Sequence, residues 1–213
     1  MSTYDLEEQE QLDSLKAWWK DNGNTILTGA IAVLLAIAAW NGWVWYQRAQ
    51  SAQAGALYET LQKAARANDV KATRDAAGAI LENYPRTAYA PLAALTSAKV
   101  HFQAGDLKTA RAQLAWAVDH ARNAQVREIA RLRLANVLLD DGAPGEALKV
   151  LEAKPEPAFA ALFAAQRGDI LVTQKKFADA RAAYKAALDG ADEKDAALRE
   201  SLRLKLDALG EGS

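Results

Sequence analysis

The chain has 213 residues, with 26 Lys and Arg against 27 Asp and Glu, and no cysteine. A net charge of −1 lacks the basic excess of a nucleic-acid-binding domain, so we expect no nucleic-acid partner. The absence of cysteine excludes a thiol nucleophile, a cysteine-ligated zinc site and a disulfide framework.

The first 21 residues are acidic and contain two adjacent tryptophans. Apolar side chains recur in residues 5–20 at spacings of three and four, which predicts a short amphipathic helix. A flexible tail with two interfacial tryptophans is the alternative. The sequence Asp-Asn-Gly at 21–23 is expected to break the chain before the next segment.

Residues 22–47 contain no Asp, Glu, Lys or Arg. At about 1.5 Å per residue, a helix of this length reaches roughly 39 Å, which exceeds the roughly 30 Å hydrocarbon core of a bilayer. Aromatic residues lie before it and toward its C-terminal end, as expected for rings at the headgroup level. The predicted membrane-interface residues are Trp18, Trp19, Trp40, Trp43, Trp45 and Tyr46. We predict a single transmembrane helix; a fully buried core helix is the alternative.

A cleaved signal peptide is a further alternative, because Ala52-Gln53-Ala54 is similar to a small-residue cleavage site. The region before the apolar segment is acidic, however, and the segment exceeds the usual 7–15 residues, so we expect an uncleaved anchor. Basic residues on its two sides are nearly equal in number, so charge leaves the orientation open.

Residues 48–67 are rich in helix-forming residues, so the membrane helix is expected to continue as a stalk. Leu57 and Leu61, four residues apart, are expected to make its first buried contacts. The domain boundaries predicted are therefore 1–21, 22–47 and 48–213.

The remaining sequence repeats with a period near 34. The central alanines lie 34, 37 and 33 residues apart, and small residues recur in the preceding segment. This is the pattern of tetratricopeptide helix pairs, in which small residues let two helices approach closely. The central alanines are Ala76, Ala110, Ala147 and Ala180, and the small residues before them are Ala98, Ala135 and Gly168.

Turn residues support this pattern. Gly105-Asp106 and Gly142-Ala143-Pro144 are expected between helices, and Pro85 and Pro155 are expected after helix ends. Leucines at spacings of four and three in 192–209 predict a C-terminal capping helix. We therefore predict an all-α chain: a transmembrane helix, then a tetratricopeptide solenoid. A helical bundle without repeats is the alternative.

Stacked helix pairs form a concave face lined by the first helix of each pair. Its lining here is expected to be mostly apolar, suited to extended or partly folded segments, and to lack the Lys, Arg and Asn cluster that holds a C-terminal carboxylate. These residues could instead pack against neighbouring helices or a dimer partner. The candidate groove residues are Leu95, Lys99, Phe102, Leu132, Asn136, Leu139, Leu162, Asp169 and Val172.

No motif for catalysis is present. His101 and His120 have no carboxylates at metal-ligand spacing, and the sequence contains no phosphate-binding glycine loop, nucleophile elbow or zinc-protease motif. We predict neither enzymatic activity nor a cofactor or metal.

The whole layout resembles the YfgM family, the ancillary subunit of the bacterial SecYEG translocon. The resemblance is carried by Tyr4 with its acidic neighbours, by the sequence LKAWWKDNG at 15–23, by the single span with its aromatic cluster, and by the repeats through Gly168-Asp169. In this chain the two adjacent aromatic residues before the span are both tryptophan. Its N-terminal segment also has more acidic residues than the family pattern requires.

The resemblance implies a cytoplasmic N-terminus, a single pass through the bacterial inner membrane and a periplasmic repeat domain. It also implies association with the SecYEG translocon, with periplasmic chaperones and with emerging polypeptides. Our leading hypothesis is a membrane-anchored adaptor; the alternative is a scaffold for a different envelope complex. A homo-oligomer is compatible with either.

Overall fold

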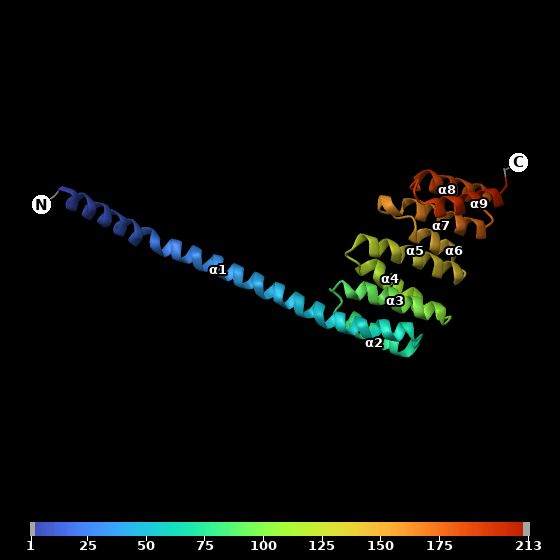
Figure 1. Cartoon of the computed structure of the whole chain (residues 1–213), viewed down its shortest axis with the longest axis horizontal. Coiled ribbons are helices and arrows are strands. Elements are labelled where there is room, and N and C mark those ends of the chain that lie inside the picture. Colours follow the sequence, from blue (N-terminus) through green and yellow to red (C-terminus); the bar gives the residue numbers. More distant parts are fainter. Residues whose placement is uncertain (1–2, 211–213) are drawn as a thin grey trace. The chain divides into compact units, whose positions relative to one another are not determined.

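The computed structural model describes residues 3–210, with side chains from Glu10 onwards. All regular secondary structure in this part is helical, which confirms the predicted all-α class. The elements are α1 (Thr3–Arg66), α2 (Val70–Asn83), α3 (Tyr89–Gln103), α4 (Leu107–His120), α5 (Ala124–Asp140), α6 (Pro144–Val150), the 3-10 helix η1 (Pro157–Phe159), α7 (Ala160–Thr173), α8 (Phe177–Gly190) and α9 (Ala196–Ala208) (Figure 1). The chain forms two compact units, Met1–Ala49 and Gln50–Ser213.

The first unit is the N-terminal part of α1. The predicted break at 21–23 is wrong, because α1 runs through it without interruption. The Asn22 side chain donates a hydrogen bond to the Trp18 carbonyl oxygen at 3.0 Å, so it caps a helical carbonyl instead of turning the chain. Asn and Gly each disfavour a helix by only about 1 kcal/mol or less, which the surrounding helix formers can override in the absence of proline.

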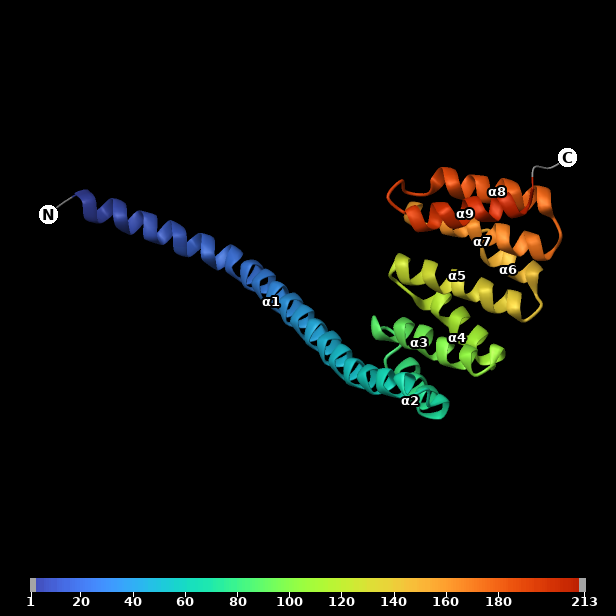
Figure 2. The same ribbon diagram turned by 45° about the vertical axis from the view of Figure 1, so that its right-hand side comes forward.

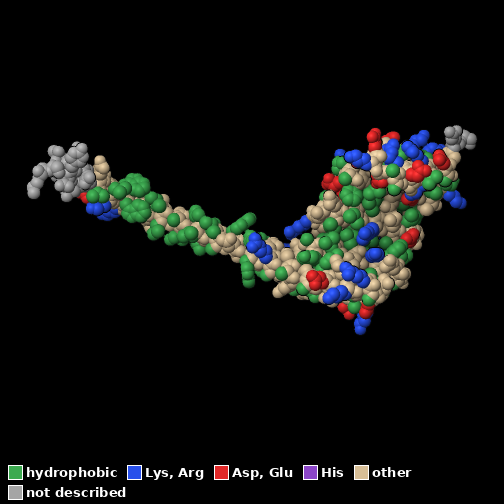
Figure 3. All heavy atoms as spheres, viewed as in Figure 1, with side chains coloured by type: hydrophobic (Ala, Val, Ile, Leu, Met, Phe, Trp, Pro, Cys, Tyr) green, Lys and Arg blue, Asp and Glu red, His purple; other side chains and the backbone are tan. Residues whose placement is uncertain are grey.

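Side chains on the charge-free part of α1 are exposed within this unit. Val33, Leu34 and Leu35 are all more than half exposed, and Figure 3 shows apolar side chains along this part of the helix. Residues Glu10–Arg66 contain a helix long and apolar enough to cross a membrane. An exposed apolar surface of this extent is typical of a segment that contacts a membrane or another protein.

The second unit is a stack of helix pairs. The last part of α1 pairs with α2, α3 with α4, α5 with α6, and α7 with α8, while α9 packs on α8 (Figures 1 and 2). Leu61 is fully buried and Leu57 partly buried against α2 and α3, as predicted, and Ala54 is buried one turn earlier. The predicted stalk is therefore part of the packed domain from Ala54 onwards.

Small residues lie where the paired helices touch. Ala98 and Ala135 are buried, and the Gly168 backbone faces the Tyr184 ring so closely that a Cβ atom there would lie 2.4 Å from a ring carbon. The central alanines of α4, α6 and α8 are fully buried as well. This confirms the predicted role of small residues in close helix packing.

The turn inside each pair has the same backbone conformation. One residue per turn has a positive φ angle: Asn68 (52°), Gly105 (79°), Gly142 (74°) and Lys175 (59°). Asp69 and Asp106 directly follow two of these residues and accept hydrogen bonds from backbone amides of α2 and α4 as N-caps. The backbone conformation of the turn therefore repeats from one helix pair to the next.

The predicted C-terminal capping helix is present as α9. Leu202 of α9 is buried in the cluster formed with α7 and α8, and the other leucines of its predicted face are partly buried there. The partly buried leucines are Leu198, Leu206 and Leu209. This helix covers the last pair of the stack, as a capping helix does.

Candidate functional site

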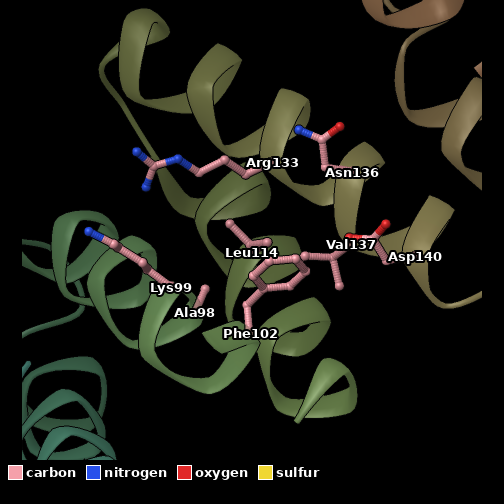
Figure 4. A pocket seen from close by; sticks show the side chains of 8 residues that line it. All are labelled: Ala98, Lys99, Phe102, Leu114, Arg133, Asn136, Val137 and Asp140. Atoms are coloured by element: carbon pink, nitrogen blue, oxygen red, sulfur yellow. The ribbon is translucent and has the colours of Figure 1, made fainter. Parts of the chain in front are cut away.

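A cavity of about 440 Å³ lies between α3 and α5, with α4 behind it (Figure 4). Phe102 lies in its middle and is 39% exposed, so its ring is available for contact. Lys99 and Arg133 lie on one side of this ring and Asp140 lies on the other. The lining residues are Ala98, Lys99, Phe102, Leu114, Arg133, Asn136, Val137 and Asp140.

Helical spacing brings these side chains together. Lys99 and Phe102 are three residues apart on α3, and Arg133, Asn136 and Asp140 follow one another at spacings of three and four on α5. Residues at these spacings lie on one face of a helix. Two neighbouring first helices of the stack therefore present a continuous lining.

A second cavity, of about 530 Å³, adjoins the first and shares two of its residues, Lys99 and Arg133. It extends across α3 to the end of α1. Its lining contains a third cation, Arg66, and no acidic residue. The complete lining is Gln62, Ala65, Arg66, Asn68, Leu95, Thr96, Lys99, Val100, Gln103 and Arg133. We call the two cavities together the α3–α5 groove.

The groove carries an excess of positive charge. Lys99, Arg133 and Arg66 line it, against the single carboxylate of Asp140. Lys99, Arg133 and Asp140 make no salt bridge with any residue that the structure describes. Their charges are therefore free to interact with a bound molecule.

Some of the predicted groove residues line the two cavities, and others pack against the core. The structure brings Lys99, Phe102 and Asn136 together in the first cavity, and Leu95 borders the second while being only 7% exposed. Leu132 and Leu139 are partly buried against the main hydrophobic core.

Sequence reasoning missed Arg133 and Asp140, which directly follow Leu132 and Leu139. On α5, Arg133 and Asp140 lie about 100° around the helix axis from Leu132 and Leu139, whereas the predicted Asn136 does line the cavity. Arg133 joins the predicted Lys99 and Asn136 in the lining of the first cavity, so this lining is more polar than expected. The polar stripe at 133, 136 and 140 was the signal that could have located this face.

Three predicted residues of α7 lie outside the α3–α5 groove. The Asp169 carboxylate accepts hydrogen bonds from the Tyr184 hydroxyl at 2.7 Å and from Lys205 Nζ at 2.7 Å, and so joins α7 to α8 and α9. Burial and the adjacent Asp169 carboxylate raise the pKa of Tyr184 above its ordinary value. Val172 packs in the same C-terminal cluster, and Leu162 is exposed.

The α5–α7 contact fixes the end of the groove. Gln166, which is nearly buried, donates hydrogen bonds from Nε2 to the Leu132 carbonyl oxygen at 3.0 Å and to the Asn136 side-chain oxygen. Asn136 is therefore held in place by α7. The Asn136 Oδ1 atom already accepts the hydrogen bond from Gln166. Lys99 and Arg133 are positioned by α3 and α5 alone.

Both histidines contact residues of the repeat domain. The His101 ring is buried and its Nδ1 lies 3.0 Å from Asp106 Oδ2, beside the N-cap of α4, while His120 stacks on Trp116. Hydrogen bonds from Thr109, followed by those from His101, lower the pKa of Asp106. Among the described residues no group of three or more His, Asp or Glu side chains could hold a metal ion.

The predicted membrane-interface residues are all on the surface of the first unit, where each is between 51% and 71% exposed. The Trp43 and Tyr46 rings lie with their centroids 6.4 Å apart near the C-terminal end of the charge-free segment. Large amphipathic rings at this place are typical of a helix that meets the headgroup region.

The family described as tetratricopeptide repeat-like domain matches residues 16–211 of the chain. A protein of Haemophilus influenzae is 33% identical over 80% of this chain and 83% of its own length. A Neisseria gonorrhoeae protein is 29% identical over 96% and 98% of the two chains, and one of Escherichia coli K12 is 25% identical over 95% and 96%. Each of these relatives is named ancillary SecYEG translocon subunit. The chain therefore belongs to the tetratricopeptide repeat-like family of ancillary SecYEG translocon subunits, the YfgM family.

Proposed function

We propose that this protein is an ancillary subunit of the Sec translocon, fastened in the inner membrane by residues 22–47. Residues 1–21 face the cytoplasm and residues 48–213 face the periplasm, with 48–67 leading from the membrane into the repeat domain. The repeat domain binds emerging polypeptides and periplasmic chaperones, and takes part in no catalysis.

The observation that carries this proposal is similarity over nearly the full chain to relatives named as translocon subunits. The exposed apolar part of α1 supports the membrane anchor, because it has the length and composition that a bilayer requires. Anchoring also explains how a shallow groove can act, since a tethered module meets its partner at an effective concentration of about a millimolar.

Co-purification tests the association. The full chain, extracted in mild detergent, is expected to bring SecY, SecE and SecG with it. A variant in which an unrelated transmembrane helix replaces residues 1–47 is expected to lose them if the anchor makes the contact. Failure of the unmodified chain to retain translocon subunits in gentle detergent contradicts the proposal.

Site-specific photo-crosslinking in living cells tests the groove. A photoreactive residue in place of Phe102 is expected to capture emerging chains and periplasmic chaperones. Phe177 is the matched control, because it is an exposed phenylalanine on α8 outside the groove lining. Equal capture from both positions argues against binding in the groove.

A further inference from the structure

We propose that the α3–α5 groove selects extended segments in which an acidic side chain lies next to a large apolar one. Lys99 and Arg133 hold the carboxylate, and Phe102 contacts the apolar side chain. This inference rests on the proposed function, since it names the class of polypeptide segment that the repeat domain binds.

Charge supplies the first argument. Lys99 and Arg133 line both cavities, Arg66 adds a third cation, and Asp140 is the only carboxylate in the lining. Hydrogen bonds between a cation and a carboxylate are shorter and stronger than neutral ones. The groove is therefore complementary to an acidic side chain of the bound segment. It repels a basic side chain placed next to Lys99 and Arg133.

The apolar contact lies beside these cations. Phe102 is the exposed ring of the first cavity, with the side chains of Leu114 and Val137 next to it. A ring flanked by aliphatic side chains favours an aromatic or branched side chain of the bound segment. Acidic and apolar side chains are thus recognised next to each other.

The two cavities meet at Lys99 and Arg133, so the groove continues on both sides of the cations. A bound backbone can pass along it, which favours an internal acidic side chain over a chain terminus. Arg133 and Asp140 are seven residues apart on α5, a rise of about 10 Å. An extended segment covers this in about three residues, so a basic residue three positions from the acidic one completes the match.

Peptide binding to the full chain in nanodiscs of zwitterionic lipid tests the proposal. The probe is a blocked peptide, Gly-Ser-Asp-Phe-Gly-Lys-Ser-Gly, carrying a neutral fluorophore and followed by fluorescence anisotropy, with empty nanodiscs as blank. Replacing its Asp by Asn is expected to weaken binding about threefold to tenfold. Replacing its Phe by Ala is expected to weaken it by a similar factor.

Charge reversal identifies the residues. The variant Lys99→Glu with Arg133→Glu is expected to lose affinity for the Asp peptide and to prefer a peptide with Lys in its place. Arg74→Glu with Lys108→Glu is the matched control, because both are exposed cations on α2 and α4 outside the groove lining. Equal losses in both variants, or none in the first, overturn the proposal.

The outcome is separable from that of the proposed function. The charge-reversed variant keeps its anchor and is expected to co-purify with translocon subunits as the unmodified chain does. Peptide selectivity without co-purification supports this inference and contradicts the proposed function. Co-purification without peptide selectivity contradicts only the inference.

Discussion

Gly168 has no room for a side chain. A Cβ atom there would lie 2.4 to 2.9 Å from three atoms of the Tyr184 ring. Because Tyr184 is itself buried and its hydroxyl is bonded to Asp169, Gly168→Ala is expected to lower the free energy of unfolding by about 1–3 kcal/mol. Urea unfolding followed by circular dichroism measures the change.

Gly78 is the matched control for this substitution. It lies in the middle of α2, and nothing lies within 4 Å of an added Cβ atom. Gly78→Ala is expected to stabilise the protein by about 0.5–1 kcal/mol, because alanine loses less backbone entropy in a helix. A similar loss from both substitutions would show that the Tyr184 contact does not determine the effect.

Asp106 gives stability a defined pH dependence. Its pKa is lowered in the folded chain, chiefly by hydrogen bonds from Thr109. A carboxyl group with a lowered folded-state pKa contributes stability above its ordinary pKa, and that contribution disappears as the pH falls through the lowered value. The difference in melting temperature between the unmodified chain and Asp106→Ala is therefore expected to shrink from about pH 7 to about pH 2. A difference that stays constant over this range contradicts the assignment.

At the scale of residues, sequence predicted packing better than it predicted the surface. The alanines and Gly168 of the repeats are recognisable because close helix contacts admit only small side chains. The lining of the groove depends on rotation about the axis of α5, and a shift of one residue exchanges Leu132 for Arg133. Repeat spacing alone does not fix that rotation.

The turns inside the helix pairs differ in how well their residues suit them. Lys175 adopts a positive φ angle that Gly105 and Gly142 adopt in the preceding pairs. A non-glycine residue in this conformation costs of the order of 1 kcal/mol. Lys175→Gly is therefore expected to raise the free energy of unfolding by up to about 1 kcal/mol, and Gly105→Ala to lower it by a similar amount. Urea unfolding measures both changes. A lower free energy of unfolding for Lys175→Gly, or a higher one for Gly105→Ala, argues against strain in these turns.

The anchoring role of α1 can be tested by one charge. Leu34 lies near the middle of the charge-free segment, so Leu34→Arg is expected to cost about 2.5–3.5 kcal/mol of membrane insertion and to increase the fraction of chain released by alkaline washing. Leu204→Arg is the control, because Leu204 is an exposed leucine of α9 in the second unit. Equal release of both variants contradicts a role of residues 22–47 in anchoring.

At the scale of elements, the sequence identified the helices from their periodicity but misplaced some boundaries: α1 runs through the predicted break at 21–23, and α6 ends at Val150, well before Pro155. Asn22 and Gly23 are turn residues by composition, and yet α1 continues through them because the flanking residues favour helix and the Asn22 side chain bonds the helix backbone. Pro85, in contrast, does mark a helix end, since α2 stops at Asn83. Proline removes a backbone donor, whereas Asn and Gly only weaken the helix.

At the scale of the whole molecule, the order of apolar segment, helix pairs and capping helix could be predicted because each has its own period. The direction in which the chain crosses a membrane could not be derived from charge, since Lys16 and Lys20 before the apolar segment are matched by Arg48, Lys63 and Arg66 after it. Orientation in this account comes from the family. A direct measurement tests this proposed orientation.

Protease digestion of intact spheroplasts provides that measurement. With an epitope at each end of the chain, the account predicts that residues 48–213 are degraded from outside while the N-terminal epitope stays protected until the membrane is lysed. Protection of the C-terminal epitope in intact spheroplasts, or recovery of the whole chain in the soluble fraction, would contradict the account.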